Sequence, residues 1–323
     1  MSLTWKPRAW GIPVLVFAVA VGLLARPIGG VDAGQTSQDA DGVRLLKGAI
    51  DMHFHVDPLT PTGGSSEHAD IAGVRVAHSR GLRGVVVKHH AEPTASLAYL
   101  LRLEVPNFDV FGAIVLNHTN GGINPTAVEF MATQIKGAPG RVVWMPAGDS
   151  EIEVRQSRTP DRPFVRVSRN GELLPEVKTV ISVIAKRGLT LASGHIAPEE
   201  ALLVFREARR QGVQHLIATH AMDLAGKMTL EQMQEAAKLG AIIEFDFRNT
   251  LSENGRRADA IRKLGPAHCL ISEFWTKGRP GEYGAPAGAG AFAAAMRARG
   301  FTDRELDTML KDNPARLLGL SDQ

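Results

Sequence analysis

Short apolar runs alternate with longer amphipathic stretches along most of this chain. From Gly48 onward, eight runs of four to seven residues are rich in apolar and β-branched side chains, as buried parallel strands are. These runs are Gly48–Phe54, Gly84–Lys88, Val110–Leu116, Arg141–Met145, Leu189–Ser193, His215–Thr219, Ala241–Phe245 and Cys269–Ser272. Eight such runs with helical segments between them predict an α/β fold, the (β/α)8 TIM barrel.

The segments between most of these runs have the spacing of amphipathic helices. They are Ser66–Arg80, Pro125–Ile135, Glu176–Arg187, Pro198–Gln211, Leu230–Leu239 and Asp259–Leu264. Thr229 precedes Gln232 by three residues, which is the pattern of a capping box at a helix start. Gly188 follows another of these segments and can take the left-handed conformation that ends a helix.

Two loops interrupt the alternation. The segment Phe164–Leu174 alternates around Asn170-Gly171, which predicts a β-hairpin inserted after the fourth strand. The segment Thr276–Gly290 is rich in glycine and proline and follows the eighth strand. The loops that follow barrel strands surround the active site of this fold, so we expect both at its mouth.

The first 33 residues differ from the rest. Lys6 and Arg8 precede an uncharged apolar run from Gly11 to Ala25, and small residues follow it. This layout predicts a signal peptide over residues 1–33, or an uncleaved N-terminal anchor as the alternative. Residues 34–47 then form a linker, and residues 48–320 form one barrel domain. We expect an exported, periplasmic protein that contacts a membrane only if the segment is not cleaved.

Composition narrows the classes of partner. Loss of residues 1–33 would remove three cations and one anion, so the formal net charge would fall from +3 to +1. Such a balance gives no electrostatic basis for nucleic-acid binding. The single cysteine, Cys269, lies in an apolar run and is interpreted as a buried thiol rather than a nucleophile. The expected partner is a small-molecule substrate. The sequence is also compatible with a homo-oligomer.

Polar side chains follow the apolar runs at the points where these runs end. The residues at the ends of the first, second, fifth, sixth and eighth runs are His53, His55, Lys88, His195, His220 and Glu273. Other polar residues at strand ends are His89, His90, His118 and Asp246. Because the carboxyl ends of the strands of a parallel barrel meet on one face, we expect these side chains to be neighbours.

The pair His53 and His55 indicates a metal site. Residues separated by one position in a strand point to the same face, so both imidazoles can reach one ion. Catalytic zinc usually has three protein ligands of this kind and an open position for water. We therefore expect Zn2+ or another divalent transition metal, held by His53, His55, His195 and His220. His89 and His90 are adjacent and cannot both point inward, so at least one of them is structural.

These residues carry a resemblance to a known group of enzymes. Asp51-Met52-His53-Phe54-His55 resembles the first-strand motif of the amidohydrolase superfamily, His195 and His220 lie where its fifth- and sixth-strand histidines lie, and Asn313–Leu320 looks like its closing helix. More closely, the chain resembles the amidohydrolase-like family DUF6282. The segments that carry this resemblance are Val87–Thr94, Gly112–Asn117, Gly121–Pro125, Val143–Pro146 and Gly194–Glu200. The resemblance implies a metal-dependent hydrolase on a TIM barrel.

Two departures from the superfamily affect the expected site. No lysine ends the fourth strand, where binuclear members carry a bridging lysine, so we expect one metal per chain. Lys88 could replace it if carboxylated by carbon dioxide, which would restore a binuclear site. At the eighth strand Glu273 stands where the superfamily usually has aspartate, so its carboxylate lies about one methylene further from the backbone.

The expected mechanism is attack by a metal-activated water on an amide, ester or lactone bond. Glu273, His220 and Lys88 are the candidate catalytic side chains: Glu273 as general base, and His220 as a further ligand or as the group that stabilises the oxyanion. Two alternatives remain. One is a metal-dependent decarboxylase or lyase, and the other is an exported binding protein that does not catalyse a reaction.

Overall fold

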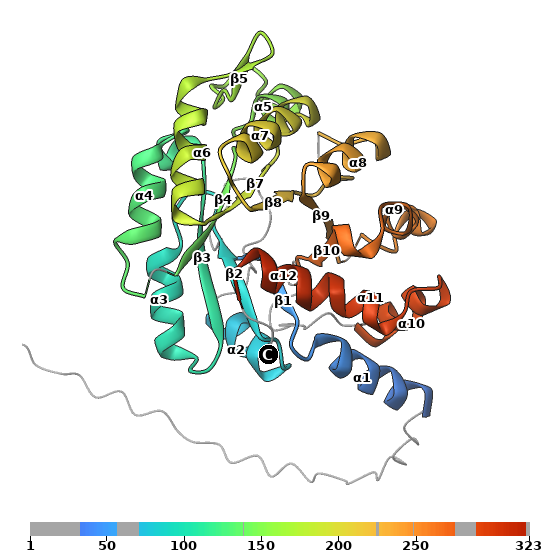
Figure 1. Ribbon diagram of the computed structural model, residues 1–323. Coiled ribbons are helices and arrows are strands. Elements are labelled where there is room, and N and C mark those ends of the chain that lie inside the picture. Colours follow the sequence, from blue (N-terminus) through green and yellow to red (C-terminus); the bar gives the residue numbers. More distant parts are fainter. Residues whose placement is uncertain are drawn as a thin grey trace, which may run out of the picture.

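The computed structural model describes residues 33–56, 71–137, 139–223, 226–247, 249–274 and 289–320. Within them, eight strands form one parallel sheet in the order β1-β2-β3-β4-β7-β8-β9-β10 (Figure 1). The strands are β1 (Ile50–His55), β2 (Gly84–Lys88), β3 (Asp109–Val115), β4 (Gly140–Trp144), β7 (Thr190–Ala192), β8 (His215–Ala218), β9 (Ala241–Asp246) and β10 (Cys269–Ser272). The predicted barrel is confirmed, and each predicted strand overlaps an observed one.

The first and last strands of the sheet meet through a side chain. The carboxylate of Asp51 on β1 accepts hydrogen bonds from the backbone amides of Glu273 at 2.8 Å and Phe274 at 2.9 Å, just beyond β10. The same carboxylate accepts a hydrogen bond from the amide of His53 at 3.0 Å. Asp51 therefore closes the seam between β1 and β10.

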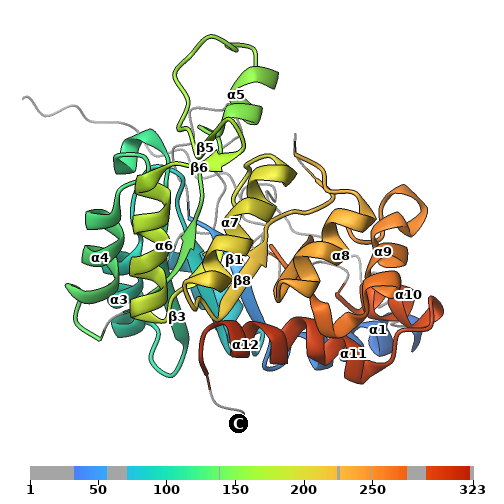
Figure 2. The same cartoon turned by 45° about the horizontal axis from the view of Figure 1, so that its top comes forward.

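Helices surround the sheet and bury its outer face (Figures 1 and 2). They are α1 (Ala33–Leu46), α2 (Ile71–Ser79), α3 (Ala95–Glu104), α4 (Pro125–Thr133), α5 (Glu151–Gln156), α6 (Pro175–Arg187), α7 (Pro198–Arg210), α8 (Leu230–Lys238), α9 (Arg256–Leu264), α10 (Ala289–Ala298), α11 (Asp303–Asp307) and α12 (Asn313–Leu317). The shorter helical segments are η1 (His118–Asn120), η2 (Glu253–Gly255), η3 (Pro266–His268) and η4 (Thr308–Asp312). The expected capping box is present at the start of α8, where Thr229 and Gln232 exchange hydrogen bonds.

Apolar side chains fill two regions of the barrel. One lies between the sheet and the helices, where Phe205 of α7 and Met131 of α4 are buried. The other is the barrel interior, which contains Ile50, Met52 and Trp144. α12 contributes side chains to the interior cluster, and Figure 2 shows it at one end of the barrel, opposite α5. The amino ends of the strands are therefore closed by α12, which leaves the carboxyl ends for the site.

The segment 34–47, expected as a linker, contains most of the helix α1 (Ala33–Leu46), which packs on α10. Gly42 lies so close to α10 that a Cβ atom at this position would be 3.0 Å from the backbone nitrogen of Gly290. Leu45 and Leu46 are buried in the core. The sequence analysis did not predict α1, because two apolar residues at the end of a polar segment give too weak a helical periodicity.

The segment after β4 contains two short strands. β5 (Ser168–Arg169) and β6 (Glu172–Leu173) are antiparallel, and Asn170 and Gly171 between them have positive φ values. Figure 2 shows β5, β6 and α5 at the end of the barrel away from α12. The helix α5 within this insertion was not predicted.

Two predictions fall largely on residues that the structure does not describe. The predicted signal peptide, residues 1–33, lies outside the described residues except for Ala33, and stays a prediction. The glycine-rich segment 276–290 is described only at its last two residues, where α10 begins. Among the described residues, no helix has the length and apolar character needed to span a membrane.

Candidate metal centre

The strand β1 contains an irregularity that determines where its histidines point. Between Asp51 and Phe54 the register against β2 shifts by one residue, since Asp51 lies opposite Val85 and Phe54 opposite Val87. An extra residue of this kind reverses the alternation of side chains along the strand. Met52 is part of the interior cluster, whereas Phe54, two residues later, packs on the outer face. The bulge therefore allows His53 and His55 to point inward beyond an inward Met52.

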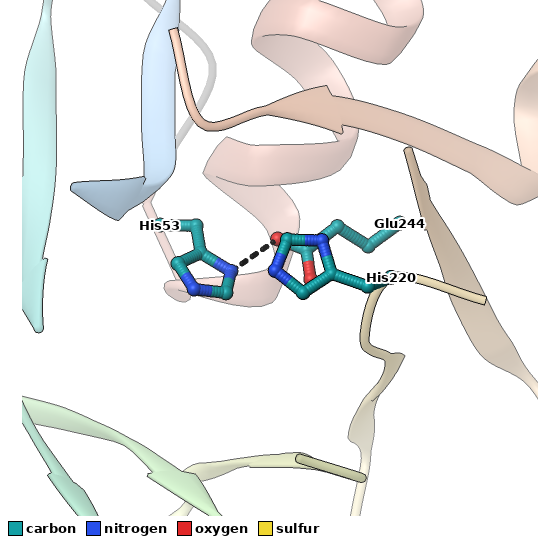
Figure 3. A group of neighbouring side chains, drawn as sticks. All are labelled: His53, His220 and Glu244. Atoms are coloured by element: carbon teal, nitrogen blue, oxygen red, sulfur yellow. Dashed lines mark hydrogen bonds and ion pairs between the residues drawn. The ribbon is translucent and has the colours of Figure 1, made fainter. Parts of the chain in front are cut away.

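His53 is fully buried and both its ring nitrogens have partners. Its Nδ1 atom lies 3.1 Å from Oε1 of Glu244 on β9, and its Nε2 atom lies 2.8 Å from Nζ of Lys88 on β2. The hydroxyl of Ser272 donates a hydrogen bond to the same oxygen of Glu244 at 2.5 Å. Figure 3 shows the His53 and Glu244 side chains converging beside His220. The strands β1, β2 and β9 thus place an imidazole in contact with a cation and a carboxylate in the barrel interior.

His53, His220 and Glu244 form a group that could hold a metal ion. One donor atom from each lies within 4.8 Å of the others, and all three side chains are buried. In the described part of the chain, Nδ1 of His220 and Oε2 of Glu244 are buried without a hydrogen-bond partner. Buried polar atoms are seldom left without a partner, and a divalent transition metal accepts two nitrogens and one oxygen. The residues present therefore fit such an ion.

Burial sets the charge of this group. It lowers the pKa values of His53 and His220 well below 6.5, and the nearby Lys88 lowers them further. These imidazoles are therefore neutral near pH 7 and keep a lone pair for a metal. Burial also raises the pKa of Glu244 to about 7, although the Ser272 hydrogen bond and Lys88 oppose this shift. A bound cation would favour the ionised carboxylate.

The other predicted histidines lie beside this group. The ring of His55 is 4.9 Å from that of His53, and the ring of His195 is 5.9 Å from that of His220, measured between centroids. The Nε2 atom of His195 is also buried without a hydrogen-bond partner among the described residues. Burial, followed by the charge of Lys88, lowers the pKa of His195 well below 6.5.

Glu273 lies between two of these histidines. Its carboxylate oxygens are 3.8 Å from Nε2 of His55 and 3.7 Å from Nε2 of His220. Glu273 and His220 both have left-handed backbone conformations, with φ values of 57° and 45°. Non-glycine residues in this region cost about 1–3 kcal/mol and concentrate at functional sites, where the surroundings enforce them. The side chains of these two residues lie next to each other, 3.7 Å apart.

The structure brings the predicted site residues together and adds one donor that the sequence analysis did not name. His53, His55, Lys88, His195, His220 and Glu273 gather at one end of the barrel as expected. His53 and His220 belong to the group of three donors, whereas His55 and His195 lie next to it. Glu244 was missed, because the end of its strand was assigned to Asp246. The available signal was a glutamate within the apolar run Ile242–Phe245, two residues before Asp246 and therefore on the same face.

The remaining polar residues at strand ends have separate positions. The Nδ1 atom of His89 accepts hydrogen bonds from the amides of Ala91 and Glu92, so this histidine has the structural role expected of one member of its pair. His90 has its ring 5.0 Å from that of His55 and belongs to the site. His118 is exposed, and its amide donates to Asp149.

Comparison with known proteins identifies similar sequences and folds. Residues 48–244 match the model described as a family of unknown function, DUF6282. No curated protein sequence matches the chain significantly. Among solved structures, the chain is similar to an amidohydrolase from Pseudomonas aeruginosa, with a TM-score of 0.60 and 11% identity over 85% of this chain and 97% of that one.

Two further structures are similar over comparable lengths. The probable dipeptidase PvdM from Pseudomonas aeruginosa has a TM-score of 0.59 and 12% identity, over 89% of this chain and 98% of that one. The organophosphorus hydrolase from Deinococcus radiodurans has a TM-score of 0.55 and 16% identity, over 85% of this chain and 94% of that one. At these identities the similarity establishes the fold.

Proposed function

This chain belongs to the DUF6282 family and has an amidohydrolase-like fold, and from this premise we propose that it is a metal-dependent hydrolase of small molecules. The observation that carries the proposal is the buried group of His53, His220 and Glu244, with two donor atoms that have no other partner in the described structure. The similar structures are named an amidohydrolase, a dipeptidase and an organophosphorus hydrolase, which supports hydrolysis as the class of reaction.

In this proposal His53, His220 and Glu244 hold one divalent ion, with His195 as a further ligand. When bound, an ion such as Zn2+ would lower the pKa of a water molecule towards 7 and polarise a carbonyl oxygen. The neutral imidazoles and the carboxylate suit this role, because ligand atoms must be deprotonated.

Glu273 acts as the general base in the proposed reaction. Its carboxylate accepts a proton from the attacking water and transfers it to the leaving group. The imidazoles of His55 and His220 lie beside its two oxygens, at 3.8 and 3.7 Å. Lys88, buried beside His53, supplies a positive charge that stabilises the negative charge on the substrate oxygen in the transition state. The bond that is cleaved is an amide, ester or lactone.

We also propose that the protein acts outside the cytoplasm, in the periplasm. The support is the charged start and the apolar run of residues 1–33, which have the layout of a signal peptide.

The test combines metal analysis with a substrate panel. Purified protein should contain about one transition metal per chain by elemental mass spectrometry, and should hydrolyse at least one class in a panel of amides, esters and lactones. Removal of the metal with a chelator should abolish the activity, and Zn2+ should restore it. A metal-loaded protein that releases carbon dioxide from carboxylated substrates but hydrolyses none of the panel would instead indicate a decarboxylase.

A further inference from the structure

The insertion after β4 delivers a carboxylate to one of the site histidines. Oε1 of Glu153, on α5, lies 3.4 Å from Nδ1 of His195. The His195 side chain is only 12% exposed and that of Glu153 26%, so the two groups meet largely out of solvent. The contact lies on the Nδ1 side of the ring, and the Nε2 atom on the other side is buried and has no hydrogen-bond partner among the described residues.

Two consecutive residues fix the position of α5 over the barrel. Asp149 accepts hydrogen bonds from the amide of His118 at 2.9 Å and from Arg162 at 2.6 Å. Ser150, the next residue, caps α5 and donates its hydroxyl to the backbone carbonyl of His195 at 2.8 Å. The insertion is therefore attached to the loop after β3 and directly to the histidine that Glu153 contacts.

The backbone around His195 is fixed by a hydrogen bond and by close packing. Its amide donates to the carbonyl of Pro146 at 2.9 Å. The preceding residue, Gly194, has a φ of 59°, and a Cβ atom there would lie 2.2 Å from the carbonyl oxygen of Met145. Only glycine fits this approach. The His195 ring therefore starts from a fixed backbone position, with its Nδ1 atom facing the Glu153 carboxylate.

We propose that Glu153 is a positioning residue for the metal centre: it holds the proton of His195 on Nδ1 and so leaves the lone pair of Nε2 free for the ion. A carboxylate on the far nitrogen of a metal-bound histidine fixes its tautomer and orientation and increases its basicity. The inference rests on the proposed metal-dependent function, because the histidine that Glu153 orients is a proposed ligand of the same metal.

The experiment compares the full-length chain with three variants. Glu153→Ala removes the carboxylate, and Glu153→Gln keeps its shape and a carbonyl oxygen. Glu151→Gln is the matched control, because Glu151 is on the same helix but pairs with Arg155 and Arg166 rather than with a histidine. Zn2+ affinity is measured by competition with a chromophoric chelator. The tautomer of His195 is measured in metal-free protein by long-range 1H–15N correlation.

We expect Glu153→Ala to weaken zinc binding by about 10–100-fold, which is the usual effect of losing such a partner. Glu153→Gln should have a smaller effect, and Glu151→Gln should bind as the wild type does. The Nδ1–H tautomer of His195 should dominate in the wild type and lose population in Glu153→Ala. A carboxylate with only a structural role would leave this tautomer unchanged.

Unchanged zinc affinity together with an unchanged His195 tautomer in Glu153→Ala would overturn the inference. A wild-type chain that binds no zinc would instead overturn the proposed function. In that case the tautomer in metal-free protein still decides whether Glu153 orients His195, so the two failures can be told apart.

Discussion

The Nδ1 atom of His53 lies 3.1 Å from Oε1 of Glu244, inside the barrel and out of contact with solvent. The two residues come from β1 and β9, which are separated in the barrel by β10. The contact therefore reaches across one strand, and Ser272 on that strand donates to the same carboxylate oxygen. Glu244 connects three strands at the point where the metal is proposed to bind.

Replacement of Glu244 should weaken metal binding without changing the fold. Glu244→Gln keeps the volume but removes the negative charge of a proposed ligand, so Zn2+ affinity should fall by more than the roughly 10–100-fold lost with a residue that only orients a ligand. Asp246→Asn, two residues along the same strand, is the matched control and should retain zinc. Both variants should keep the wild-type circular dichroism spectrum. Equal zinc affinity in Glu244→Gln and wild type would exclude Glu244 from the site.

Glu273→Gln tests the general base. This variant cannot accept a proton, so turnover should decrease by roughly 10²–10⁴-fold. Metal content should remain, because His53, His220 and Glu244 do not depend on this side chain. His53→Ala should by contrast lose metal and activity together. If turnover in Glu273→Gln stays within a few-fold of wild type, the base is another group, and Asp246 is the next carboxylate to test.

The number of metals depends on the state of Lys88. With an uncarboxylated lysine, we expect about one transition metal per chain. Lys88→Met keeps most of the side-chain volume and removes a cation 2.8 Å from His53, so it should not lower the metal content, although turnover should fall. Two metals in the wild type, with loss of one in Lys88→Met and dependence on bicarbonate, would show a carboxylated lysine and a binuclear site.

The metal-free protein should become less stable as the pH falls below 6.5. The unfolded chain protonates His53, His195 and His220 near 6.5, whereas the folded chain does so only at lower pH, so acid favours unfolding. Glu244 opposes this trend, because its folded pKa of about 7 lies above the ordinary value of 4.5. Three histidines outweigh one carboxyl group, so the unfolded chain binds more protons than the folded chain below pH 6.5, and the free energy of unfolding should decrease as the pH falls.

Urea unfolding at pH 7.5, 6.5 and 5.5 measures this dependence. The matched variant is His220→Asn, because asparagine tolerates the left-handed backbone at position 220. It should make the pH dependence less steep, because one group fewer takes up a proton on unfolding. A free energy of unfolding that is constant or increases between pH 6.5 and 5.5 would contradict the neutral state of these histidines in the fold.

The barrel and the location of the site could be predicted because both depend on local patterns. Apolar runs such as Gly84–Lys88 are bounded by polar residues and glycines, and a parallel barrel brings their carboxyl ends together whatever their separation in the chain. The sequence therefore indicated that His195 and His220 would lie near His53.

The full group of candidate donors could not be predicted in the same way. The inward direction of His53 depends on the bulge after Asp51, which no simple alternation predicts. Glu244 lies within a strand, so a search of strand ends did not find it. Glu153 reaches His195 from an insertion whose helix has only six residues, and its place depends on tertiary contacts of Asp149 and Ser150.

The hydrogen bonds that Asp51 accepts from Glu273 and Phe274 have a consequence for the order of folding. The bond from Glu273 joins residues 222 positions apart, so it can form only after nearly the whole chain has been synthesised. Contacts of such long sequence separation carry a large loop-closure cost and are expected late in folding. The amide that Asp51 binds belongs to Glu273 itself. We therefore expect Glu273, the proposed general base, to reach its position in the last stage of folding, so that partly folded chains contain the histidines but not the complete site.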